Sequence, residues 1–222
     1  MAREQYRDRL SSLRTEVVLL AELVLERYED AVAAAEAGDL RRADQIVRQD
    51  DEINRWYLEL EGECIDLIAR NQPVAGDLRL ITASFKIITD LERIGDLATN
   101  LAERTEYESA IHPAVDIESL GRTAGEMVAA AVAAYEHDDD AACRAVAADD
   151  DALDSDCAAT TQRIIRDLIE RTAGDGDTRA RTVDKTTRGL LTVRDIERVG
   201  DHAVNIAART LYMIDGDAEL LY

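Results

Sequence analysis

The segment "DLERIGDLATNL" (residues 90–101) decides the fold, because the chain contains it twice. The segment "DIERVGDHAVNI" (195–206) repeats its Asp, Glu, Arg, Gly, Asp, Ala and Asn in place, 105 residues later. A fainter echo links "QDDEIN" (49–54) to "ADDDALD" (148–154). Similarity at a fixed spacing indicates a duplicated structural unit. The sequence therefore predicts two halves that are built alike.

Apolar residues at three- and four-residue spacing predict three long helices in each half. With 2 Pro, 11 Gly and 4% aromatic residues, the composition gives strands little material, so the predicted class is all-α. Gly38, Asp39 and Pro73 punctuate the first half as a helix end, a helix cap and a break. The expected helices span about 4–37, 40–70, 75–106, 115–137, 139–172 and 178–213. We place the division between the halves near Pro113, giving units 1–109 and 110–222.

The charge of the chain excludes several classes of partner. It carries 47 acidic and 26 basic residues, a formal net charge of −21, and only Lys86 and Lys185 are lysines. This charge repels nucleic acid and anionic lipid, so neither is an expected partner. Carboxylate excess with Arg in place of Lys suits a halophilic protein from a high-salt cytoplasm, where salt screens the self-repulsion. No apolar run reaches the roughly 20 residues of a membrane span, so no membrane insertion is expected.

The repeated motif places a carboxylate pair one helical turn apart at the edge of an apolar helix face. In the middle of that face stands a Gly, which costs roughly 1 kcal/mol relative to Ala in a helix and so indicates a close contact with another helix. The Arg of each motif is expected to point to the polar side. The carboxylates are Glu92, Asp96, Glu197 and Asp201, the glycines Gly95 and Gly200, and the arginines Arg93 and Arg198.

Two like charges at a helix contact repel each other and need compensation. One solution is an ion-pair network with an Arg from a neighbouring helix. The other is a divalent or iron cation held by the motif together with acids of the facing helix, for which oxygen donors are suitable ligands. The candidate ligands are Glu92, Asp96, Glu197 and Asp201, with weaker candidates at Asp50, Asp51, Asp150 and Asp151. The residues alone leave both solutions open.

The remaining chemistry-bearing residues give little support for catalysis. Cys64, Cys143 and Cys157 are scattered and are expected to be buried thiols. Surface positions are expected for the three histidines: His112 between the halves, His137 at a helix end and His202 on a polar side. No phosphate-binding glycine loop or nucleophile elbow is present. We expect a protein that is not an enzyme.

With the duplicated "LERIGD" and "IERVGD" and the preceding "RNQPVAGDLRLI" (70–81), the chain resembles the PhoU family of phosphate-uptake regulators over about 8–213. The resemblance implies two antiparallel three-helix bundles side by side, a homodimer and a cytoplasmic, non-enzymatic protein. Such a protein restrains phosphate import by acting on a phosphate ABC transporter, through its ATPase subunit or another phosphate-signalling partner. Some relatives carry metal clusters on carboxylates that correspond to Glu92, Asp96, Glu197 and Asp201.

Two other classes of function stay open from the sequence. The same carboxylates would suit a metal-storage bundle or a metal-dependent enzyme. A third reading is a purely structural bundle that oligomerises through apolar helix faces.

Overall fold

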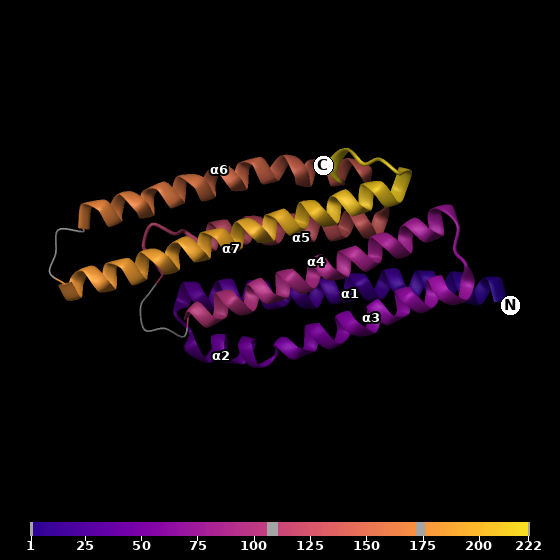
Figure 1. Ribbon diagram of the computed structural model, residues 1–222, viewed down its shortest axis with the longest axis horizontal. Helices are drawn as coiled ribbons and strands as arrows, with labels where there is room; N and C mark the ends of the chain where they lie inside the picture. Colours follow the sequence, from indigo (N-terminus) through magenta and orange to yellow (C-terminus); the bar gives the residue numbers. More distant parts are fainter. Residues whose placement is uncertain (1, 106–110, 172–175, 222) are drawn as a thin grey trace.

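The computed structural model describes residues 2–105, 111–171 and 176–221 (Figure 1). Every regular element in these ranges is helical, which confirms the predicted all-α class. The elements are α1 (Ala2–Ala37), α2 (Leu40–Arg48), α3 (Asp50–Asn71), α4 (Ala75–Thr105), α5 (Ile117–His137), α6 (Asp140–Arg171), α7 (Gly176–Asp215) and a short 3₁₀ helix, Glu219–Leu221. In these ranges, no helix combines the length and the apolar character that crossing a membrane requires.

The helices run antiparallel along the length of the molecule in two packed halves (Figure 1). Within the first half, α4 packs against α1 and α3, and within the second, α7 packs against α5 and α6. The halves meet where α1 packs on α5 and α4 packs on α7, so these four helices form the centre, with α3 and α6 on the outside. One buried apolar core runs through both halves. The predicted division at 109/110 lies outside the described residues.

The helix ends of the first half follow the expected punctuation. Gly38 adopts a left-handed φ of +64°, which suits a residue without a Cβ at a helix end. The Asp39 side chain then accepts hydrogen bonds from the backbone N–H groups of Arg41 and Arg42, which caps α2. These contacts confirm the roles read from Gly38 and Asp39.

The predicted helix over 40–70 is wrong in one respect, because it breaks at Gln49 into α2 and α3. Gln49 has φ −99° and ψ 5°, and its backbone N–H turns back to the carbonyls of Ile46 and Val47. The Gln49 side chain accepts a hydrogen bond from Arg27 of α1, which holds the break against the neighbouring helix. The break makes Asp50 the first residue of a new helix, whereas the corresponding helix of the second half, α6, is continuous.

Two buried tyrosines tie the halves together. Tyr135 of α5 reaches into the first half, where its hydroxyl lies 2.6 Å from Ser84 Oγ on α4. Tyr28 of α1 packs against the second half, since a Cβ on Gly125 of α5 would lie 3.5 Å from its ring. Burial and, to a smaller extent, the neighbouring thiol of Cys157 on α6 raise the pKa of Tyr28. Each half therefore contributes one aromatic side chain to the packing of the other.

Candidate functional site

The glycines of the repeated motif set how closely its carboxylates approach the outer helices. A Cβ on Gly95 would lie 3.0 Å from Ile53 Cδ1 of α3, and one on Gly200 would lie 2.6 Å from Leu153 Cδ2 of α6. Both distances are shorter than ordinary carbon contacts, so any larger residue would force the facing side chain to move. The predicted tight helix contacts are confirmed, at equivalent places in the two halves.

In the first half, Asp50 lies opposite the motif with both of its carboxylate oxygens hydrogen-bonded. Thr99 Oγ1 of α4 donates to Asp50 Oδ1 at 2.8 Å, and Asn54 Nδ2 donates to Oδ2 at 3.3 Å. Both oxygens of this carboxylate therefore have the donor that a polar group at a helix contact requires. Asp50 is thus held by two neutral donors, one from α4 and one from its own helix, α3.

Arg93 lies beside the carboxylates of its own motif. Its Nε is 3.4 Å from Glu92 Oε2, and its Nη1 is 3.3 Å from Asp96 Oδ2. Arg93 is exposed on the polar side, as expected, and its long side chain still reaches both acids along its own helix. The ion pairs of the first half therefore use the motif's own Arg, whereas the ion-pair alternative from the sequence named an Arg of a neighbouring helix. Arg198 is exposed, and its charge lowers the pKa of both Asp96 and Asp201.

Burial nevertheless dominates the electrostatics of the first pair. It raises the pKa of Glu92, and the charges of Asp96 and Asp50 add to this rise against the opposing charge of Arg93. Burial also raises the pKa of Asp96, again with a contribution from Asp50. Partial desolvation among like charges disfavours the ionised forms. These acids are held together at a cost that the single exposed Arg93 only partly offsets.

In the second half, Asp150 is less well compensated. Its Oδ1 is buried and has no hydrogen-bond partner among the described residues. Burial raises the pKa of Asp150 to about 6, and the charges of Asp154, Asp201, Asp151 and Glu197 contribute in that order. The charges of four further carboxylates thus act on one half-buried acid. Of the two motif clusters, this one would therefore be stabilised more by a bound proton or cation.

The predicted surface position is wrong for two of the three histidines. His202 Nδ1 lies 2.8 Å from Asp90 Oδ1 across the α4–α7 contact. His112 is buried, with its Nε2 3.1 Å from Asp167 Oδ2 of α6. His137 is exposed, as expected. Both errors have one cause: the carboxylate that holds each imidazole lies on another helix, far away in the sequence. All three cysteines are buried and free, as expected.

Comparison with known proteins now decides the family. The family model described as "PhoU domain" matches this chain twice, over residues 17–105 and 117–210. The chain belongs to the PhoU family. The two matches cover the two halves that the repeated motif indicated.

Individual PhoU proteins match along nearly the whole chain. The phosphate-specific transport system accessory protein PhoU homolog of Pseudomonas putida is 30% identical over 217 residues, which are 96% of this chain and 82% of the relative. The phosphate-specific transport system accessory protein PhoU of Escherichia coli K12 is 32% identical over 217 residues, or 96% of this chain and 86% of the relative. The crystal structure of PhoU from Pseudomonas aeruginosa superposes with a TM-score of 0.88 at 30% identity, covering 96% of this chain and 100% of that one.

The carboxylates of the repeated motif do not form a preassembled metal site in this PhoU-family chain. Among the described residues, no three His, Cys, Asp or Glu side chains converge closely enough to hold a metal ion. Glu197 and Asp201 have raised pKa values, caused first by burial and next by the charge of Asp154. The weaker candidates Asp51 and Asp151 are exposed. The metal site therefore stays a prediction, with the second half as its better location.

Asp154 is the site residue that sequence reasoning missed. Its charge contributes to the raised pKa values of Asp150, Glu197 and Asp201. The signal was present, because Asp154 stands one helical turn after Asp150 and occupies the place that Asn54 has in the first half. The exchange of an amide for a carboxylate makes the second cluster the more acidic one.

Proposed function

We propose that this protein is a non-enzymatic, cytoplasmic regulator of phosphate uptake that restrains a phosphate ABC transporter. The observation that carries the proposal is the relationship over 96% of the chain to proteins named as accessory proteins of phosphate-specific transport. Two PhoU domains account for most of the chain, so regulation is expected to act through contact with other proteins. The ATPase subunit of the transporter is the proposed contact, and a homodimer the proposed form.

Deletion of the gene tests this function directly. Cells that lack the protein should take up labelled phosphate faster than the parent strain in phosphate-rich medium, and the wild-type gene should restore restraint. A second deletion strain without the transporter provides the control, since its uptake should not respond to the protein. Unchanged uptake after the first deletion would contradict the proposal.

The purely structural alternative makes a different prediction for the motif. The chain with Glu92→Gln and Glu197→Gln keeps its volume but loses one charge in each half. If the protein were only a structural bundle, this folded variant would restore restraint as well as wild type. We expect the variant to restore restraint incompletely, while circular dichroism shows unchanged helix content.

A bound cation is a second proposal, favoured by the buried and unpartnered Oδ1 of Asp150. A set of carboxylates fits a hard divalent cation or iron. Asp150, Asp154, Glu197 and Asp201 would hold such an ion, with small side-chain movements. The ion would neutralise their mutual repulsion and link α6 to α7. The same carboxylates would also serve a storage or enzymatic role, which the proposed regulator does not need.

Elemental analysis of the purified protein distinguishes these possibilities. We expect stoichiometric metal that is lost on Glu197→Gln with Asp201→Asn. The matched change in the first half, Glu92→Gln with Asp96→Asn, should remove less, because Arg93 already pairs with both acids there. Metal-free wild-type protein that still controls uptake would remove the cation from the proposal and leave the regulator intact.

A further inference from the structure

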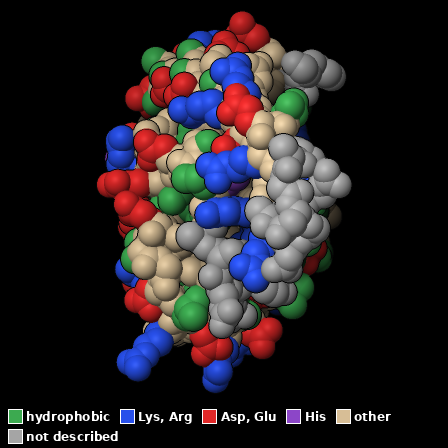
Figure 2. Space-filling model, turned by 90° about the vertical axis from the view of Figure 1, so that its left-hand side faces the viewer, with side chains coloured by type: hydrophobic (Ala, Val, Ile, Leu, Met, Phe, Trp, Pro, Cys, Tyr) green, Lys and Arg blue, Asp and Glu red, His purple; other side chains and the backbone are tan. Residues whose placement is uncertain are grey.

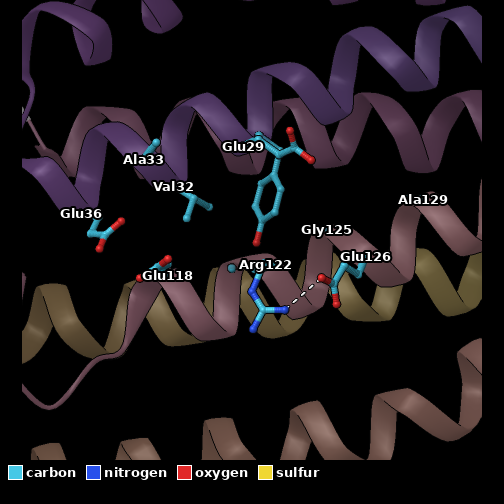
Figure 3. A pocket seen from close by; sticks show the side chains of 11 residues that line it. Glu29, Val32, Ala33, Glu36, Glu118, Arg122, Gly125, Glu126 and Ala129 are labelled. Carbon is cyan, nitrogen blue, oxygen red and sulfur yellow. Dashed lines mark hydrogen bonds and ion pairs between the residues drawn. The ribbon is translucent and has the colours of Figure 1, made fainter.

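A surface groove follows the contact between α1 and α5, away from the repeated motif (Figure 3). Its volume is about 490 Å³, and Tyr28, Val32, Gly121 and Gly125 lie along it. A Cβ on Gly121 would lie 2.7 Å from Val32 Cγ2, so this Gly lets the two helices approach closely. Small side chains, Ala33 and Ala129, continue the lining. The groove therefore offers an apolar floor between two helices.

Acidic side chains surround this floor from both helices. Glu29 and Glu36 come from α1, and Glu118 and Glu126 from α5. Glu126 is paired with Arg122 Nη1 at 3.0 Å. Among the described residues, no Arg, Lys or His forms an ion pair with Glu29, Glu36 or Glu118. The groove thus keeps an uncompensated negative charge.

Glu36 and Glu118 face each other from opposite walls (Figure 3). The charge of Glu118 is the main cause that raises the pKa of Glu36, with further contributions from burial, from a side-chain hydrogen bond between the two groups and from the charge of Asp116. Two acids that repel across a groove attract a positively charged group placed between them. A guanidinium is suited to this position because it can donate to both carboxylates at once.

The same carboxylate pair also borders a second hollow. This hollow, of about 360 Å³, is lined by Glu36 and Glu118 together with apolar side chains that include Ile111, Val115 and Ile117. Glu36 and Glu118 thus lie between two hollows with apolar walls. A ligand that fills both needs apolar groups on each side of a central positive charge.

The Tyr28 ring belongs to the apolar floor, where it lines the groove and is 1% exposed. The apolar floor and the acidic rim together describe a binding surface.

We propose that the α1–α5 groove is a docking site for a basic amphipathic helix of a partner protein, with an Arg or Lys between Glu36 and Glu118. Apolar side chains on either side of the basic residue fill the two hollows. This is the helix-in-groove mode of recognition, in which apolar anchors recur at three- and four-residue spacing. The inference deepens the proposed function, on which it rests, because it specifies how a regulator of this kind contacts its partner.

The charges on the chain argue against a second copy as the occupant. A second copy would bring its own acids to the rim, in a protein with a net charge of −21. Like charges placed opposite each other disfavour association. A basic partner segment is the complementary occupant.

A designed peptide pair tests the groove. The probe is a fluorescent helical peptide of about 14 residues, long enough for ~20 Å of helix, with Leu on one face and a central Arg pair. Its control carries Glu in place of both Arg. By fluorescence anisotropy, the Arg peptide should bind with a Kd in the micromolar range, and the Glu peptide should not bind. Absence of binding by the Arg peptide, or equal binding by both, would overturn the proposal.

Two matched variant pairs separate groove binding from general attraction to an acidic protein. Glu36→Gln with Glu118→Gln should weaken binding at least about tenfold, or ~1.4 kcal/mol. Glu59→Gln with Glu103→Gln removes the same charge from exposed positions on α3 and α4 and should leave binding within about twofold. Equal weakening by both pairs would show nonspecific attraction and refute the groove.

A steric pair gives an independent check. Ala129→Trp fills the groove and should reduce binding, whereas Ala130→Trp, at the exposed neighbour that does not line it, should not. Equal effects of the two changes would count against the groove. So would sedimentation that shows self-association lost in the Glu36→Gln, Glu118→Gln variant, since a second copy would then be the occupant. The phosphate-uptake assay does not depend on peptide binding. A failed groove proposal can therefore be told apart from a failed proposal that the protein regulates phosphate uptake.

Discussion

Asp50 and Asp150 occupy equivalent places in the two halves, and their surroundings differ. Asp50 is the first residue of α3 and receives hydrogen bonds from Thr99 and Asn54. Asp150 lies within the continuous helix α6, and the chain has Val204 and Asp154 at the places of Thr99 and Asn54. One helix break and two side-chain exchanges thus convert a satisfied carboxylate into a crowded one. Duplication has kept the backbone arrangement while the electrostatics of the two copies have diverged.

Gly200→Ala and Gly95→Ala should show the largest difference between the halves. The added methyl at 200 would overlap buried Leu153 at 2.6 Å and approach Asp150 Oδ1 at 3.0 Å, whereas at 95 its nearest contact is Ile53 at 3.0 Å. Overpacking of this kind costs ~1–3 kcal/mol, offset by roughly 1 kcal/mol of helix propensity. We expect urea denaturation to show a loss of about 2 kcal/mol for Gly200→Ala and under ~1 kcal/mol for Gly95→Ala. Equal losses would mean that the two helix contacts are equivalent after all.

Tyr135→Phe and Tyr28→Phe compare the two crossed tyrosines. Ser84 Oγ donates to Leu80 O, so its lone pair accepts the hydroxyl of Tyr135. Removing that hydroxyl should destabilise the protein by about 1 kcal/mol. Removing the unpartnered hydroxyl of Tyr28 should be neutral or stabilising by up to ~1 kcal/mol. Thermal unfolding of both variants measures this difference, and a loss of stability in Tyr28→Phe would reveal a partner for its hydroxyl.

Asp150→Asn tests the electrostatic difference through pH. The folded pKa of Asp150, about 6, lies above its unfolded value. The contribution of protonated Asp150 to the free energy of unfolding is therefore fully present below about pH 4, the unfolded pKa. This contribution is lost as the pH rises through about 6, the folded pKa. We expect Asp150→Asn to flatten the stability profile over this window. At pH 7 it should raise the free energy of unfolding by about 1 kcal/mol, after allowance for solvent screening.

Asp50→Asn is the matched control for that experiment. Its amide can still accept from Thr99 but loses the second acceptor oxygen that Asn54 uses. Its stability at pH 7 should fall slightly, by roughly 0.5–1 kcal/mol, rather than rise. A rise in both variants would show that general relief of the −21 charge, and not the local cluster, is responsible.

The parts of the site that follow from local pattern could be predicted. The repeat and the helix period identified the tight contacts of Gly95 and Gly200 and placed the carboxylates at their margin. Contacts that depend on helix pairing could not, since the partners of His202 and His112 lie more than 50 residues away, at Asp90 and Asp167. A helical projection gives the direction of a Cβ only, so it also missed the reach of the long Arg93 side chain.

The break at Gln49 was missed for a different reason. Residues 46–53 continue the apolar period with Ile46 and Ile53, so the local pattern favours an unbroken helix. The contact that holds the break comes from Arg27 on another helix. Asp154 could have been found, because the repeat itself aligns it with Asn54.

The crossed tyrosines are not two copies of one residue. Equivalent backbone hydrogen bonds at Asp39 and Asp139 align α1 with α5 at an offset of 100 residues, so Tyr28 corresponds to Val128 and Tyr135 to Ala35. Each half therefore places its aromatic side chain at a different point along the shared contact. The packing between the halves has lost the symmetry that the repeat implies, and a change at one tyrosine has no counterpart at the same position of the other half.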